Sequence, residues 1–205
     1  DEALRTVQTD GVINVTPPQF HKAVSLTALE AGVPVLSEKP LAGTRQEALD
    51  IVAAANRTGV LHMVTQNYRY SSPTQTLKQA LRSGAMGEIG AAHIEFFKGP
   101  HFGGFREEMP YPLIIDMSIH HFDLMRFFLG SDPVSVYGRS WNPPWSWFKG
   151  DASAAVTLAF ANNVIVSYNG SWCSQGRETP WNAHWRFECA KGVVAMQNDQ
   201  VYTQL

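Results

Sequence analysis

The sequence of 205 residues has few charged side chains, few cysteines and no long apolar run. Charged residues make up 17% of the chain and the formal net charge is −2, so we expect no surface suited to a nucleic-acid phosphate backbone. Charged residues interrupt the apolar stretches well before membrane-spanning length, and no signal-like segment opens the sequence. These absences predict a cytoplasmic protein whose partners include neither nucleic acid nor a membrane.

Only two cysteines are present, Cys173 and Cys189. They are enough for one disulfide, but without an export signal two reduced thiols are the favoured interpretation. Neither cysteine has a His or Cys neighbour at metal-ligand spacing. The sequence therefore predicts no metal site.

A glycine-rich phosphate-binding turn is also missing. No Gly-x-Gly-x-x-Gly string occurs, and the segment Gly84-Ala-Met-Gly-Glu-Ile-Gly90 has a different spacing and leads from a predicted helix into a predicted strand. We interpret this segment as a turn.

The first third of the chain alternates short apolar runs with helical patterns. Strands are predicted at residues 11–16, 33–36 and 61–65, and helices at 19–31 and 44–57. Strand–helix alternation favours a parallel sheet covered by helices, so residues 1–67 are predicted to be part of a Rossmann-like domain.

From residue 68 the pattern changes. Helices are predicted at 73–83 and 113–129, and strands at 89–98, 133–139, 152–160, 164–172, 185–189 and 193–196. Short turns between consecutive strands favour antiparallel pairing. Residues 68–205 therefore predict an α+β domain with an open, mainly antiparallel sheet backed by helices, whose last strand near Val201 we expect to be cut by the chain end.

The apolar helix predicted at 113–129 carries three polar residues, Asp116, His120 and Asp123. On a regular α-helix they fall at about 0°, 40° and 340°, within one stripe. A carboxylate one turn from an imidazole can orient it as a general base. A satisfied buried polar cluster and, less favoured, a metal site are the alternatives. His121 points away from the stripe and is expected to pack in the core.

A second candidate is Ser37-Glu-Lys-Pro40, which follows a predicted strand. Ligands bind at this edge of open α/β sheets, and Pro40 restricts the backbone of Lys39 to extended geometry. An ammonium aimed in this way can stabilise negative charge developing on a substrate oxygen. A solvated loop lysine is the alternative.

Four strings together resemble the Gfo/Idh/MocA family, which includes glucose-fructose oxidoreductase and inositol dehydrogenase. They are Asp10-Gly-Val-Ile-Asn-Val-Thr-Pro-Pro18 with His21, Ala28-Leu-Glu-Ala-Gly-Val-Pro-Val-Leu-Ser-Glu-Lys-Pro40, Gln66-Asn-Tyr-Arg-Tyr70 and Asp116-Met-Ser-Ile-His-His-Phe-Asp123. The resemblance covers nearly the whole chain and favours the functional interpretation of the polar stripe.

The resemblance implies an enzyme that transfers hydride between NAD or NADP and a secondary alcohol of a sugar, inositol or related polyol. Lys39, Asp116 and His120 would form the catalytic set, and Asp123 would anchor the helix. The cofactor would contact Thr16, Pro17, His21, Glu38, Lys39 and Asn67. The substrate would contact Arg69, Asp116, His120 and Trp141. The antiparallel sheet would mediate homo-oligomerisation.

The missing glycine-rich turn departs from the family pattern. We expect that strand–helix units of on the order of 60 residues are lost upstream and that the chain alone binds dinucleotide poorly. The loop at 99–112, with His101, Arg106 and Glu107, and the segment Trp141–Phe148 could wall a sugar pocket or serve packing and subunit contact. Alternative functions are NAD-assisted glycoside cleavage or elimination, and a non-catalytic sugar-binding or oligomerisation module.

Overall fold

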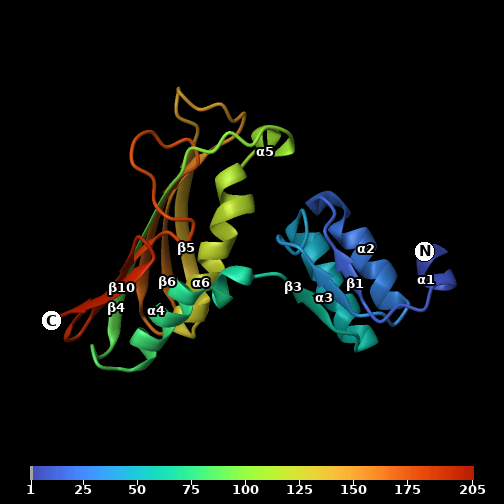
Figure 1. The fold of residues 1–205 in the computed structure, drawn as a ribbon, viewed down its shortest axis with the longest axis horizontal. Coiled ribbons are helices and arrows are strands. Elements are labelled where there is room, and N and C mark those ends of the chain that lie inside the picture. The colour runs from blue at the N-terminus through green and yellow to red at the C-terminus, as the bar shows by residue number, and fades with distance from the viewer. Residues whose placement is uncertain (1) are drawn as a thin grey trace. The chain divides into compact units, whose positions relative to one another are not determined.

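The computed structural model describes residues 2–205, apart from the side chains at positions 3 and 5 (Figure 1). The chain divides into two units, Asp1–Gln66 and Asn67–Leu205, and each is described by itself.

The first unit is a parallel sheet packed against helices. Its elements are α1 (Glu2–Thr6), β1 (Val12–Asn14), α2 (Pro18–Glu30), β2 (Val35–Ser37), α3 (Arg45–Thr58) and β3 (His62–Val64). The strands lie in the order β1-β2-β3, and both pairings are parallel. Leu29 of α2, Val35 of β2 and Ile51 of α3 are buried together and form the centre of this unit's core.

The ends of α3 follow from its sequence. Thr44 accepts a hydrogen bond from the backbone N–H of Glu47, whose carboxylate accepts one from the backbone N–H of Thr44. The helix stops at Gly59, which has a φ of 68° and so adopts a left-handed conformation that is easy for glycine alone.

One face of the parallel sheet is exposed within the described part of the chain. Ile13, Leu36 and Met63 are register partners across the three strands, and their exposed fractions are 72%, 39% and 50%. Parallel sheets are normally covered on both faces, so this apolar row is available for further packing.

The second unit is an α+β layer structure. Its helical elements are η1 (Asn67–Tyr70), α4 (Ser72–Arg82), α5 (Phe105–Glu108), η2 (Leu113–Ser118) and α6 (Ile119–Leu129). Its strands are β4 (Ile89–Phe97), β5 (Pro133–Trp141), β6 (Ser153–Phe160), β7 (Ile165–Ser171), β8 (His184–Cys189), β9 (Gly192–Gln197) and β10 (Gln200–Gln204).

The seven strands lie in the order β10-β9-β8-β4-β7-β6-β5. All neighbouring strands are antiparallel except β4 and β7, which are parallel. The predicted combination of a parallel α/β sheet with a mainly antiparallel α+β sheet is confirmed. The parallel pair was not predicted, because it joins strands that are distant in the sequence.

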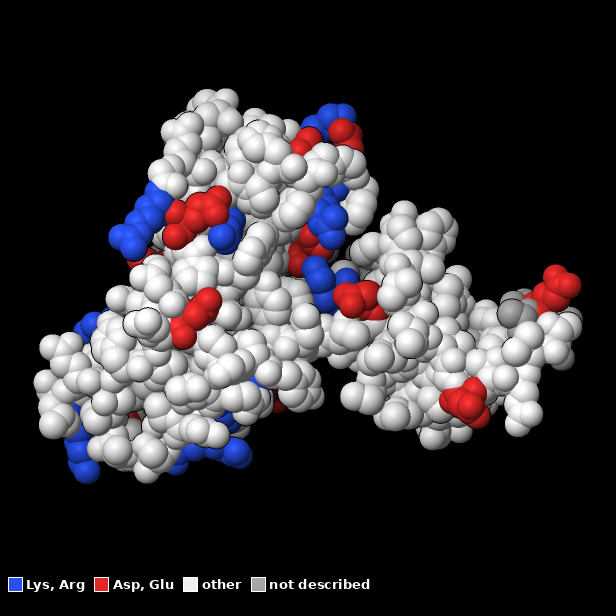
Figure 2. Space-filling view, in the orientation of Figure 1, with Lys and Arg blue, Asp and Glu red and all other residues white. Residues whose placement is uncertain are grey.

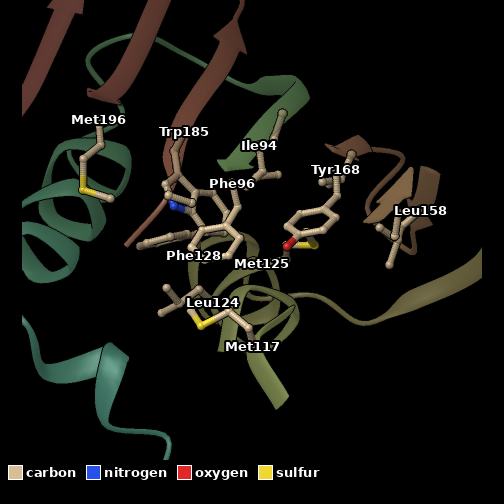
Figure 3. Close-up of a cluster of buried hydrophobic side chains, with 14 of the residues drawn as sticks. Ile94, Phe96, Met117, Leu124, Met125, Phe128, Leu158, Tyr168, Trp185 and Met196 are labelled. Carbon is tan, nitrogen blue, oxygen red and sulfur yellow. The ribbon is translucent and has the colours of Figure 1, made fainter. Parts of the chain in front are cut away.

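The core of the second unit lies between the sheet and its helices (Figure 3). Strand β4 alternates, with Ile94 and Phe96 fully buried and Glu95 between them in sequence exposed. Figure 3 shows Trp185 and Tyr168 of the neighbouring strands directed toward the same cluster. This packing holds α6 against one face of the sheet.

The single α-helix predicted at 113–129 is wrong in its first part. Residues Leu113–Ser118 form a π-helix, and the α-helix begins at Ile119. A π-helix is wound with i→i+5 hydrogen bonds, so the angle of 100° per residue does not apply to Asp116. The predicted stripe of Asp116, His120 and Asp123 is therefore not a stripe on one regular helix.

Candidate active site

In the first unit, a buried polar network joins the loops that follow β1 and β2. The Asn14 carboxamide oxygen accepts from the Thr16 hydroxyl at 2.7 Å, and the Asn14 amide group donates to the backbone oxygen of His21 at 3.3 Å. The ring nitrogens of His21 lie 2.7 Å from the backbone oxygens of Pro40 and Thr16. His21 therefore ties the two loops together at the carboxyl edge of the sheet.

The loop after β2 carries Glu38 and Lys39, both half-buried. The Glu38 backbone N–H donates to the Asn14 backbone oxygen at 2.8 Å, which extends the strand pairing into the loop. The Glu38 carboxylate accepts from the Lys39 backbone N–H at 3.2 Å, and the Lys39–Pro40 peptide is cis. The backbone of Lys39 is thus held at the edge where α/β sheets bind ligands.

The predicted cofactor residues differ in how accessible they are. Thr16 is half-buried and Pro17 is exposed, whereas the His21 side chain has no exposed surface. A direct contact of His21 with a nicotinamide ribose stays a prediction, and its observed contacts are to the loop backbone.

In the second unit, His120 of α6 is stacked on Tyr68 of η1. The ring centroids are 4.2 Å apart, the rings are inclined by 9°, and His120 is only 5% exposed. Burial, followed by the negative charges of Asp116 and Asp199, raises the pKa of Tyr68 to about 12, so its hydroxyl remains protonated at neutral pH. Tyr68 was not predicted as a site residue, although it lies in the Asn-Tyr-Arg string.

Asp116, which is 7% exposed, is paired with an arginine from the loop before it. Arg106 Nε donates to Asp116 Oδ2 at 2.7 Å. The Arg106 guanidinium lies 5.2 Å from the Phe102 ring centroid and 4.9 Å from that of Phe105. Because ring faces attract cations, these contacts hold the arginine in place. Arg106 is a site residue that the spacing argument along the helix could not find.

Asp123 anchors α6 to η1. The Arg69 guanidinium donates to both Asp123 oxygens at 2.6 Å, a bidentate geometry that fixes orientation as well as charge. Any contact of Arg69 with substrate, which stays a prediction, would therefore be made by an arginine already paired with Asp123. Asn67 and Trp141, the other predicted binding residues of this unit, lie on the surface.

The expectation that His121 packs in the core is confirmed. Its ring has no exposed surface and contacts the Tyr168 hydroxyl at 3.3 Å and the Trp181 backbone oxygen at 3.2 Å. Burial lowers the pKa of His121 to about 3, with a smaller effect from His120, so the ring is neutral at pH 7.

The loop at 99–112 packs on the tryptophan-rich segment after β5. His101 is stacked on Trp147 with centroids 3.7 Å apart, and Trp145 Nε1 donates to the Cys173 backbone oxygen at 3.0 Å. Two of the three tryptophans of this segment thus have contacts within the chain, whereas Trp141 is 43% exposed.

Other site types receive no support in the described part of the chain. Among these residues, no three His, Cys, Asp or Glu side chains are grouped so as to hold a metal ion, and no helix is long and apolar enough to cross a membrane. Cys173 and Cys189 are both free.

A parallel α/β unit with polar loops at the carboxyl edge of its sheet, followed by a unit with an open, mainly antiparallel sheet, is the organisation that the sequence predicted. Residues 1–66 match the model of an oxidoreductase family with an NAD-binding Rossmann fold, and residues 74–195 match the GFO/IDH/MocA C-terminal domain. The chain belongs to the Gfo/Idh/MocA family, as its four strings predicted.

Named relatives act on sugars and inositol. The chain is 27% identical over 189 residues to the 1,5-anhydro-D-fructose reductase of Ensifer adhaerens, covering 90% of the chain and 57% of the relative. It is 34% identical over 140 residues to an inositol 2-dehydrogenase of Arthrobacter sp., covering 68% of the chain and 41% of the relative. The chain thus matches only about half the length of these relatives.

A solved oxidoreductase from Agrobacterium radiobacter, in complex with NAD+, L-tartaric acid and magnesium, has the same fold. Its TM-score is 0.85 at 22% identity, and the match covers 98% of this chain and 62% of that one. This likeness supports the fold of both units, and the family model supports NAD as the cofactor class.

Proposed function

We propose that this chain belongs to an enzyme that transfers hydride between nicotinamide and a secondary alcohol of a sugar, inositol or related polyol. The observation that carries the proposal is the His120 environment, in which a nearly buried imidazole is stacked on Tyr68, a residue that also feels the charge of the Arg106-bound Asp116. A general base needs this kind of fixed orientation, because proton transfer depends on geometry before it depends on pKa. The family assignment and the reductase and dehydrogenase relatives support a net redox reaction.

In this proposal, His120 accepts the proton of the substrate hydroxyl. Lys39 of the first unit is proposed as a hydrogen-bond donor that stabilises negative charge developing on a substrate oxygen. Asp116 orients His120, and Arg106 keeps the Asp116 carboxylate in place. Nicotinamide, when bound, supplies the acceptor for the hydride.

The loops of the first unit fit a dinucleotide by their chemistry. The half-buried Thr16 hydroxyl offers an acceptor to a ribose hydroxyl, and the carboxylate of Glu38 offers another. Because the His21 network holds both loops, these groups are fixed before the ligand arrives. We propose Thr16, Pro17, Glu38, Lys39 and Asn67 as cofactor contacts, with His21 holding their loops.

The test uses the full-length protein with NAD or NADP and a panel that includes myo-inositol and 1,5-anhydro-D-fructose. His120→Ala and Lys39→Ala should each lower turnover by about 100-fold or more, the usual size of a lost acid–base contribution, and change cofactor affinity less. The matched controls are His93→Ala on an outer sheet position and Lys22→Ala on α2.

Unchanged turnover in both site variants would refute the assigned roles. Consumption of a glycoside without accumulation of reduced nicotinamide would favour the transient-oxidation chemistry of cleavage or elimination instead.

We further propose that the protein forms homo-oligomers through the open face of the second sheet. Tyr137, Thr157, Ser167, His93 and Arg186 are register partners across five strands, on the face opposite the core residues. Tyr137 is 80% exposed, and an aromatic residue so exposed on a flat sheet is typical of an interface.

A further inference from the structure

A polar pocket lies at the carboxyl end of α6 in the second unit. Its volume is about 440 Å³. Its charged and hydroxyl-bearing lining residues are Arg69, Lys78, Arg82, Arg126, Ser131 and Asp132. Four cations therefore face one carboxylate.

Two of the cations have structural tasks. Arg69 is bound to Asp123, and Lys78 donates to the backbone oxygens of Phe127 and Phe128 at the end of α6. A helix end leaves carbonyl groups without partners, and a cation there satisfies them. Contacts that stabilise the fold thus account for the positions of Lys78 and Arg69.

The other two cations are not needed for that purpose. Arg126 pairs with Asp132 at 2.6 Å, but the two side chains are 54% and 71% exposed, and such pairs contribute only about 0–1 kcal/mol to stability. Arg82, in the last turn of α4, has no hydrogen bond or ion pair within the described residues. Capping of the helix end therefore does not account for Arg82 and Arg126.

The charges in the pocket are not balanced. Burial lowers the pKa of Lys78, and the positive charges of Arg82 and Arg69 lower it further. Four cations line the pocket with one carboxylate, Asp132, and Asp123 is occupied by Arg69, so positive charge is in excess there. A bound anion would balance this excess.

We propose that this pocket binds the phosphate group of a small molecule. The N–H groups of an arginine form a planar fork that matches the geometry of a phosphate. Arg126 donates to Asp132 through Nε alone, so the terminal amino groups of Arg126 remain for a ligand. Arg82 and the Ser131 hydroxyl supply further donors to the lining.

A small ligand fits better than a polymer. The volume suits a phosphorylated sugar or a mononucleotide rather than an extended chain. On the face drawn in Figure 2, Lys and Arg side chains form separate small groups and no continuous band. The net charge of the whole chain is −2, which gives no long-range attraction for nucleic acid.

The test is calorimetric titration of the chain with inorganic phosphate, glucose 6-phosphate and AMP at constant ionic strength. At least one probe should bind saturably with a stoichiometry of one. The double variant R82A/R126A should weaken that binding at least ten-fold, whereas Arg57→Ala on α3, which removes an exposed arginine paired with Glu30, should leave it unchanged. Circular dichroism checks that the variants fold. If the double variant does not fold, the single variant Arg82→Gln replaces it in the titration.

Equal affinity for all three probes would indicate recognition of free phosphate, and tighter binding of glucose 6-phosphate or AMP would indicate recognition of a larger phosphorylated ligand. Lack of saturable binding, or equal losses in R82A/R126A and Arg57→Ala, would overturn the proposal. The readout is binding alone, so its outcome is independent of the oxidoreductase proposal.

Discussion

At the scale of single residues, neighbouring side chains hold the side chains and loops of the candidate site in position. Tyr68 fixes the plane of the His120 ring, and Arg106 holds Asp116. His21 joins the loop after β2, which carries Lys39, to the loop after β1. Each of these contacts involves a side chain that is wholly or partly buried, where a lost partner costs more than at the surface. We therefore expect substitution of these positioning residues to lower turnover, by less than substitution of the proposed catalytic residues.

Tyr68→Leu tests the stacking contact. Loss of an aromatic pair worth about 0.5–1.5 kcal/mol should lower turnover about two- to ten-fold, because the His120 ring gains freedom to rotate. Tyr68→Phe keeps the ring and should stay near the parent rate. Steady-state kinetics of the full-length variants measures the effect, and equal losses in both variants would assign the role to the hydroxyl group instead.

His121 makes stability depend on pH. Its folded pKa of about 3 lies below the unfolded value of about 6.5, so the unfolded state binds a proton that the folded state does not. The contribution is fully present above pH 6.5 and is lost as the pH falls, by about 2 kcal/mol from pH 7.5 to pH 5.

Urea unfolding at several pH values between these limits measures this loss. His121→Gln should flatten the pH dependence of the unfolding free energy relative to the parent, and His93→Gln at an exposed position should not. An unchanged slope in His121→Gln would show that this ring is not the source.

At the scale of elements, the local sequence determines where some helices begin and end, whereas tertiary contacts determine the geometry of others. Helix α3 has a complete capping box and a glycine stop, both readable from the sequence. The η2–α6 segment lacks a side-chain cap, and its winding changes from π to α at Ile119. Its geometry follows from the contacts of Asp116 and the packing of Leu113 and Met117 in the core.

Thr44→Ala tests the capping box of α3. It removes the acceptor for the Glu47 backbone N–H and should lower the free energy of unfolding by about 1 kcal/mol. Thr44→Ser keeps a hydroxyl group and should retain most of the stability. Chemical denaturation of both variants provides the comparison, and equal stability of Thr44→Ala and the parent would contradict the assigned cap.

At the scale of the whole molecule, the exposed sheet surfaces suggest further packing. The apolar row of the first sheet and the open face of the second are both uncovered within the described residues. Exposed apolar side chains on flat sheets are typical of contact surfaces. The proposed homo-oligomer uses the second of these faces.

Tyr137→Asp tests this interface. A carboxylate placed within a self-associating face would have to be desolvated, so the variant should sediment with a smaller mass than the parent at equal concentration. Leu49→Asp, at a partly exposed position on α3, is the matched control. A parent protein that is monomeric, or an unchanged mass in Tyr137→Asp, would exclude an interface centred on this residue.

The sequence by itself determined the class of fold, the family, the positions of the strands and those of the longer α-helices, whereas the short helices α1 and α5 were not predicted. Hydrophobic periodicity, turn residues and caps act over a few residues, so they can be read locally. It also singled out Lys39, Asp116 and His120, whose roles stay a proposal. Only the tertiary structure decided the parallel β4–β7 pair, the π-helical turn at Asp116 and the partners Tyr68 and Arg106. These features depend on contacts between segments that are separated in the chain, and a local pattern does not encode which distant side chain will fill a given space.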